Sequence, residues 1–143
     1  TRVNIVPPQD LTNQHLMAEF REIRHVGPSL SRSLKSKNFD INKIPKKYTL
    51  NKGHVTFFYN KGLFLYRRFN ELKCELIYRG FNINKNTVFE KQQFPNGFLN
   101  EWIPSKSEIE INLERINLRI KEKPNFYKRN SINAKKYNSK SSN

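Results

Sequence analysis

Apolar residues recur at helical spacing in three separate segments, and this periodicity constrains the fold more than any other feature of the sequence. In the first segment, Leu16, Phe20 and Ile23 follow at intervals of four and three residues, which places them on one face of an α-helix. The segment most typical of a strand, HVTFFY at 54–59, has no evident second strand to pair with. We therefore expect it to be irregular or helical, and we predict an all-α fold.

The second helical segment covers residues 63–80 and reads LFLYRRFNELKCELIYRG. Its apolar stripe consists of Leu65, Phe69, Leu72 and Leu76. Gly80 follows the stripe, where a left-handed residue commonly ends a helix. The third segment covers residues 105–123, and Ser105 and Glu108 have the spacing of a capping box. We predict that it buries Ile109, Leu113, Ile116 and Ile120, and that Asn112, Arg115, Arg119 and Glu122 share its polar face.

The first helix follows an extended arm, because Pro7 and Pro8 keep residues 1–10 out of a helix. Asp10 or Thr12 is placed to cap its first turn. Gly27-Pro28 should kink or interrupt it, so that residues 30–37 either resume the helix or belong to a new one. The expected architecture is a single compact domain at 1–128 with three main helices and long loops, followed by a basic tail at 129–143.

The charge of the chain indicates a polyanionic partner. Twenty-seven Lys and Arg residues stand against 12 Asp and Glu residues, which gives a net charge of +15, and each phosphate contacted by such a surface releases bound counterions. A single cysteine and three unclustered histidines predict neither a disulfide nor a metal site. No apolar run approaches the ~20 residues of a membrane span, and we expect an intracellular, non-secreted protein.

The α-amine of residue 1 is a candidate nucleophile. The pKa of an α-amine is about 7.7–8.0, against about 10.4 for lysine, so an appreciable fraction is neutral near pH 7. Such an amine can form a Schiff base at a sugar carbon, and Glu22 is a candidate to stabilise the charge that develops and to move protons. The alternatives are routine trimming of an initiator methionine before Thr1 and an ordinary surface role for Glu22.

Two further groups of residues suit DNA. Arg2, Arg21, Arg24, Arg115 and Arg119 would grip phosphates on either side of a target nucleotide, or else form a solvated basic face. The aromatic residues of PNFYK (124–128) and Tyr137 suit base stacking, or else pack on the domain. His15 is a candidate to orient Glu22, and His54 is expected to hold a loop.

The order and spacing of several runs resemble the phage-type pyrimidine-dimer DNA glycosylases. These runs are TRVN, QHLMAEFREI, GHVTFFYNK, ELIYRGFNI, ERINLR and P-x-F-Y-K, and the match covers about residues 1–128. The resemblance implies an all-α fold whose N-terminal arm threads between helices. It also implies a DNA glycosylase and abasic-site lyase that flips out the base opposite the lesion.

The resemblance assigns roles residue by residue. The amine nucleophile falls on Thr1 and the essential glutamate on Glu22. Residues that contact DNA fall on Arg2, Gln14, Arg21, Arg115 and Arg119, with His15 in support. The chain departs from the family pattern at His25, where an arginine is common, since Arg24 is displaced by one residue. Either Arg24 or His25 would then take the place of that arginine in binding DNA. Phe126 also stands in place of a tryptophan.

The resulting hypothesis is repair of ultraviolet damage in double-stranded DNA by a monomer that needs no metal or organic cofactor. The 5′ pyrimidine of a cyclobutane dimer would be released and the strand cut by β-elimination. One alternative is a hydrolase with an N-terminal threonine, but that class needs layered β-sheets. The other is a non-catalytic basic protein that binds or shapes DNA.

Overall fold

The computed structural model describes residues 2–129; Thr1 and residues 130–143, including Tyr137, lie outside this part. All regular elements from Arg2 to Arg129 are helical, which confirms the all-α prediction. The elements are α1 (Asn13–Glu22), a 3₁₀ turn (Ile23–His25), α2 (Val26–Leu34), α3 (His54–Phe57), α4 (Gly62–Tyr78) and α5 (Lys106–Glu122). Further 3₁₀ turns cover Pro8–Asp10, Ile41–Lys43, Phe58–Asn60 and Lys91–Gln93.

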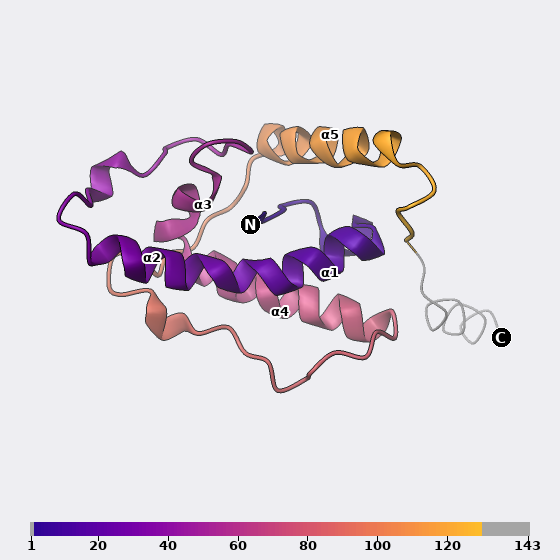
Figure 1. Cartoon of the computed structure of the whole chain (residues 1–143), viewed down its shortest axis with the longest axis horizontal. Coiled ribbons are helices and arrows are strands. Elements are labelled where there is room, and N and C mark those ends of the chain that lie inside the picture. Colours follow the sequence, from indigo (N-terminus) through magenta and orange to yellow (C-terminus); the bar gives the residue numbers. More distant parts are fainter. Residues whose placement is uncertain (1, 130–143) are drawn as a thin grey trace.

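The long helices enclose the N-terminal arm. In Figure 1, α1 runs along α4, α2 continues the course of α1, and α5 lies on the other side of the arm. The arm residues Val3, Asn4, Ile5 and Val6 are all at most 5% exposed. An extended segment buried this deeply confirms the expectation that the arm threads between helices.

The predicted stripes of the first two segments form the main core. Leu16, Ile23, Leu65, Leu72 and Leu76 are fully buried. Phe20 stacks on Phe69 with 5.1 Å between ring centroids, which joins α1 to α4. Burying a large apolar side chain stabilises a fold by about 1.5–3 kcal/mol, so these stripes hold the two helices together. Gly80 has a φ of 87°, as predicted for a residue that ends a helix in the left-handed region.

The segment HVTFFY is helical, because its aromatic residues point inward at helical rather than alternating spacing. His54, Phe57 and Phe58 are buried, and the two phenylalanine rings pack edge to face with each other and with Trp102. Tyr48 completes this cluster. Tertiary packing therefore overrides the β propensity of the segment.

The break in the first helix precedes Gly27-Pro28. The 3₁₀ turn Ile23–His25 separates α1 from α2, and Pro28 lies in the first turn of α2, where its missing N–H would have no partner within the helix. A Cβ atom at Gly27 would collide with the end of the flexible Gln93 side chain, which would have to move aside.

Helix α5 confirms one prediction and corrects another. Ser105 and Glu108 form the capping box, and Ile116 is buried. However, Leu113 is 39% exposed and Asn112 is fully buried, so the predicted positions of these two residues were wrong. The polar Asn112 turns inward because it meets the peptide groups of the arm, which need hydrogen-bond partners when buried.

Candidate active site

A cavity of about 570 Å³ opens between α1, α5, the arm and the segment 126–127. The sequence-predicted residues that line it are Arg2, Gln14, His15, Arg21, Glu22, Arg115 and Arg119. Its apolar lining includes Met17, Ala18, Phe81, Ile116, Phe126 and Tyr127. The cavity thus combines a cationic rim with apolar and aromatic surface, as suits a sugar, a base and the flanking phosphates.

Helix α1 supplies the acidic residue of the site. Thr12 begins the helix by accepting a hydrogen bond from the backbone N–H of His15. From that start, Gln14, Arg21 and Glu22 all line the cavity. The apolar face of the helix carries Leu16 and Phe20 into the core.

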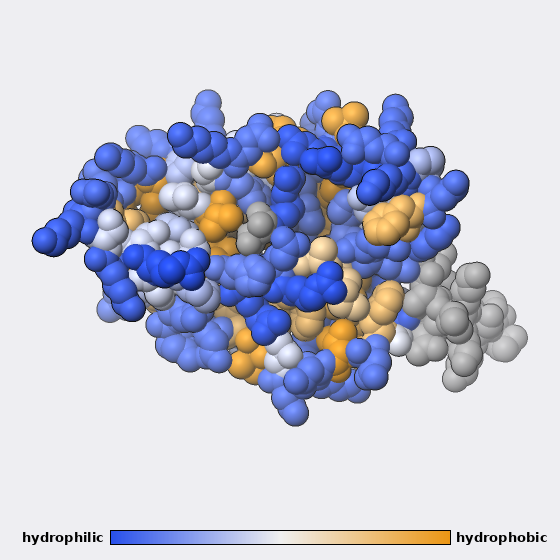
Figure 2. Space-filling model, viewed as in Figure 1, coloured by the Kyte–Doolittle hydropathy of each residue, from blue (hydrophilic) through white to orange (hydrophobic). Residues whose placement is uncertain are grey.

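The arginines make the cavity strongly cationic. Burial lowers the pKa of Arg2, and the positive charge of Arg115 lowers it further. Arg115 donates to Asn51 Oδ1 at 3.3 Å, and Arg119 lies 3.4 Å from Glu122. Figure 2 shows that hydrophilic side chains cover most of the face of the molecule that is seen in Figure 1. Guanidinium groups drawn from the arm, α1 and α5 around one cavity are well suited to phosphate.

Two carboxylates line the cavity in different environments. Glu19 is 1% exposed, and its two oxygens accept hydrogen bonds from Arg68 Nε and Nη2 at 2.8 and 3.0 Å. Burial raises the pKa of Glu19, while Arg68 and Asn4 oppose that rise. Glu22 is half-buried and lies among the arginines. Glu22 is therefore the more accessible of the two carboxylates, and its catalytic role stays a prediction.

His15 and the aromatic residues of PNFYK close one side of the cavity. His15 Nδ1 lies 2.6 Å from Thr12 Oγ1, and its ring stacks on Tyr127 with 4.6 Å between centroids. Burial lowers the pKa of His15. Gln14 Oε1 accepts a hydrogen bond from the backbone N–H of Lys128 at 2.8 Å. These contacts anchor the segment after α5 onto α1, and a role for His15 in orienting Glu22 stays a prediction.

Arg24 and His25 do not line the cavity. Both belong to the 3₁₀ turn that follows α1, and both are exposed. The contacts of Arg24 and His25 with DNA therefore stay predictions.

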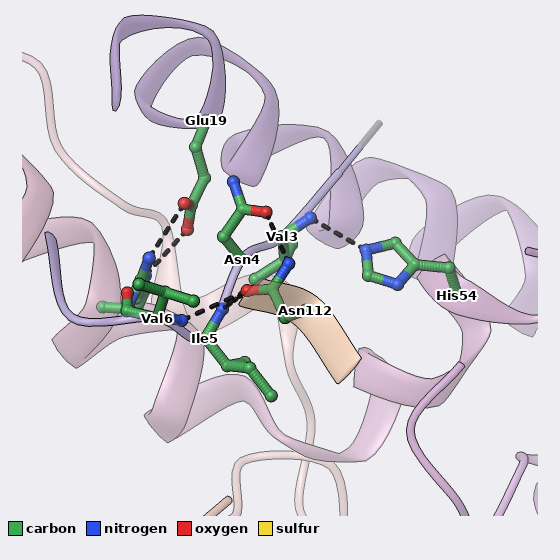
Figure 3. Close-up of polar contacts among 8 residues, drawn as sticks. Val3, Asn4, Ile5, Val6, Glu19, His54 and Asn112 are labelled. Carbon is green, nitrogen blue, oxygen red and sulfur yellow. Dashed lines mark hydrogen bonds and ion pairs between the residues drawn. The ribbon is translucent and has the colours of Figure 1, made fainter. Parts of the chain in front are cut away.

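The arm that leads to residue 1 is held by side chains from three helices (Figure 3). Val3 N–H donates to His54 Nε2 at 2.8 Å. The N–H groups of Ile5 and Val6 both donate to Asn112 Oδ1, at 2.7 and 3.2 Å. Asn112 Nδ2 donates to Asn4 Oδ1 at 2.9 Å, and the carbonyl of Val6 accepts from Arg68 Nη1 at 2.7 Å.

Sequence reasoning missed Asn4, Glu19 and Asn112 at this site. A signal for Asn112 was present, because it lies three residues after Ile109 and four before Ile116, on the side of α5 that those residues bury. His54 was expected to hold a loop, and its 2.7 Å contact with the carbonyl of Thr49 confirms this. Its bond to the arm had no sequence signal, since the two partners are 51 residues apart.

The family model for pyrimidine dimer DNA glycosylases matches residues 1–88. The chain belongs to the pyrimidine dimer DNA glycosylase family. The matched part contains the arm, α1 with Glu22, and α4. Helix α5 with Arg115 and Arg119 lies beyond the match, and the fold brings it to the glycosylase cavity.

The described part of this glycosylase contains neither a membrane-spanning helix nor a cluster of metal ligands. Within residues 2–129, no helix is long and apolar enough to cross a bilayer. The same residues contain no group of three or more His, Cys, Asp or Glu side chains that could hold a metal ion.

The stability of this glycosylase should fall between pH 6.5 and 4 because of His54. Burial lowers the pKa of His54 from 6.5 to about 4, so the unfolded chain binds a proton in this range and the folded chain does not. Folding therefore loses up to about 3 kcal/mol as the pH falls, at about 1.4 kcal/mol per pKa unit. Urea unfolding at several pH values measures this loss, and His54→Gln should remove most of it. An equal pH dependence in both proteins would contradict the assignment.

Proposed function

We propose that this glycosylase removes the 5′ pyrimidine of a cyclobutane dimer in duplex DNA and then cuts the strand as an abasic-site lyase. The nucleophile is the amine of Thr1. Its nitrogen bonds to the anomeric carbon while the glycosidic bond breaks. The base leaves the sugar with the bonding electron pair and takes up a proton, and the cyclobutane ring still joins it to the 3′ pyrimidine. Ring opening converts the adduct to an imine.

The imine explains the second step. It acidifies the proton on the adjacent C2′, and loss of that proton expels the 3′ phosphate by β-elimination. Hydrolysis of the imine then restores the amine. Glu22 stabilises the positive charge on the sugar and carries protons between these steps.

One observation supports this proposal above the others: Arg2, the residue next to Thr1, lines the same cavity as Glu22. The negative charge of Glu22 acts on Arg2 together with the positive charges of Arg115 and Arg119. A DNA strand whose phosphates contact these arginines would bring a sugar between Thr1 and Glu22. Arg21 and Gln14 border the same strand, while Arg24 and His25 would meet the duplex farther out.

The experiment is to incubate the protein with ultraviolet-irradiated supercoiled plasmid in EDTA. We expect nicks in the irradiated plasmid and none in the untreated control. With borohydride present, an abasic duplex should give a covalent protein–DNA adduct, because reduction fixes the imine. Nicking without adduct formation would reject the imine, and absence of both would reject the proposed activity.

The basic charge also suits a non-catalytic protein that binds or shapes DNA. Such a protein would bind irradiated and undamaged duplex equally and would nick neither. The same plasmid experiment, combined with binding measurements on the two duplexes, distinguishes these functions.

A further inference from the structure

His54 connects the arm to the loop before α3 through a neutral imidazole. Its Nδ1 lies 2.7 Å from the carbonyl oxygen of Thr49, and a carbonyl only accepts hydrogen bonds, so Nδ1 carries the proton. Nε2 then has a lone pair for the N–H of Val3 at 2.8 Å. In Figure 3 the ring points at the backbone of Val3 from the side of the arm opposite Glu19.

Among the hydrogen bonds of the described arm, this bond at Val3 lies nearest to residue 1. Only Thr1 and Arg2 precede Val3, and the next polar anchor is the Asn4 side chain bound to Asn112. Each residue extends the reach of a chain by about 3.3–3.6 Å. Loss of the His54 bond therefore removes a backbone anchor two residues from Thr1 and should widen the volume that the terminal amine explores.

We propose that His54 is a positioning residue, which fixes the arm at Val3 so that the amine of Thr1 meets the sugar held by the arginines of the cavity. This inference rests on the proposed function. His54 is 5% exposed and does not line the cavity, so it acts on the reaction through the backbone of Val3. Because rates fall steeply when reacting atoms are displaced by about 1 Å, loss of this bond should slow attack about 10- to 100-fold.

The chain allows a matched pair of variants at this residue. The amide oxygen of glutamine reaches the place of Nε2, so His54→Gln keeps an acceptor for Val3. The shorter amide of asparagine reaches the place of Nδ1, so His54→Asn keeps the donor to the carbonyl of Thr49. It loses the acceptor for the N–H of Val3. Both remove the ring packing with Tyr48 and Phe58, so their losses of stability should be similar.

The measurement is the single-turnover rate of the borohydride-trapped adduct on an abasic duplex, below the melting temperature of both variants. We expect His54→Asn to form adduct 10- to 100-fold more slowly than His54→Gln, which should stay within about threefold of the unmodified protein. The Kd for the duplex should change less than about twofold, because the arginines are untouched. In a plot of adduct-formation rate against pH, His54→Asn should reach a lower plateau at high pH than His54→Gln. The midpoint of the curve should be the same in both, since the pKa of the Thr1 amine is not altered.

Equal rates in the two variants, or a shifted pH midpoint, would overturn the role of His54. A glycine inserted between Arg2 and Val3 provides a second test that leaves the buried arm intact. It moves the amine by up to about 3.5 Å and should slow adduct formation at least tenfold, and an unchanged rate would also overturn the inference. Absence of adduct with the unmodified protein would instead reject the imine mechanism itself, and the inference with it.

Discussion

Acetylation of the α-amine of Thr1 is expected to abolish base release and strand cutting, with a loss of at least about 1,000-fold in rate. The neutral amine is the proposed nucleophile, and an amide nitrogen has no basic lone pair with which to attack. Duplex binding should remain within a few-fold, because the phosphate contacts come from the arginines. The measurement is nicking of irradiated plasmid by acetylated protein, with mass spectrometry to confirm that only residue 1 is modified.

Substitutions at Thr1 provide the control for this prediction. Thr1→Ala keeps the amine and removes the hydroxyl, so it should retain most of the activity. In a hydrolase whose threonine side chain attacks, Thr1→Ala would abolish activity and Thr1→Ser would preserve it. Activity in the acetylated protein, or its loss in Thr1→Ala, would show that the amine is not the nucleophile.

Glu22→Gln should bind damaged duplex with nearly unchanged Kd and release the base about 100- to 10,000-fold more slowly. The amide has nearly the same shape, but it neither carries the negative charge that stabilises the sugar cation nor accepts a proton, and acid–base catalysis contributes about this range. Single-turnover base release and a gel-shift titration on one dimer-containing duplex measure the two effects separately.

Glu110→Gln is a suitable control for Glu22→Gln, because Glu110 is exposed on α5 and does not line the cavity. It makes the same change of charge and should leave the rate of base release unaffected. If Glu22→Gln cleaved at the normal rate, the proposed carboxylate would be the wrong one. Glu19 would be a poor replacement, since both of its oxygens are engaged by Arg68.

The features that could be predicted from the sequence depend on neighbours along the chain. The stripe from Leu65 to Leu76 and the apolar face of α1 follow from helical spacing alone. The capping box of Ser105 and Glu108 depends on residues three apart. These predictions are confirmed because helix geometry fixes which side chains share a face, whatever the rest of the protein does.

The inaccurate predictions concern residues whose position depends on a distant partner. Asn112 was placed with Arg115 on a solvent-facing surface, yet it is fully buried against the arm. Leu113 was expected inside and is 39% exposed. Hydropathy favours leucine in the interior, but the unpaired peptide groups of a buried extended arm require a polar partner, and this requirement decides how α5 is oriented.

Helical periodicity and composition were enough to predict the helical segments, the excess of positive charge and the residues that could carry chemistry. The packing of the helices was needed to show that Arg2, Glu22 and Arg119 line one cavity. This arrangement depends on the buried arm. Its backbone groups cannot pair with one another in an extended chain, so side chains from α3, α4 and α5 bind them. Those bonds bring the beginning of the chain and its last described helix to the same site.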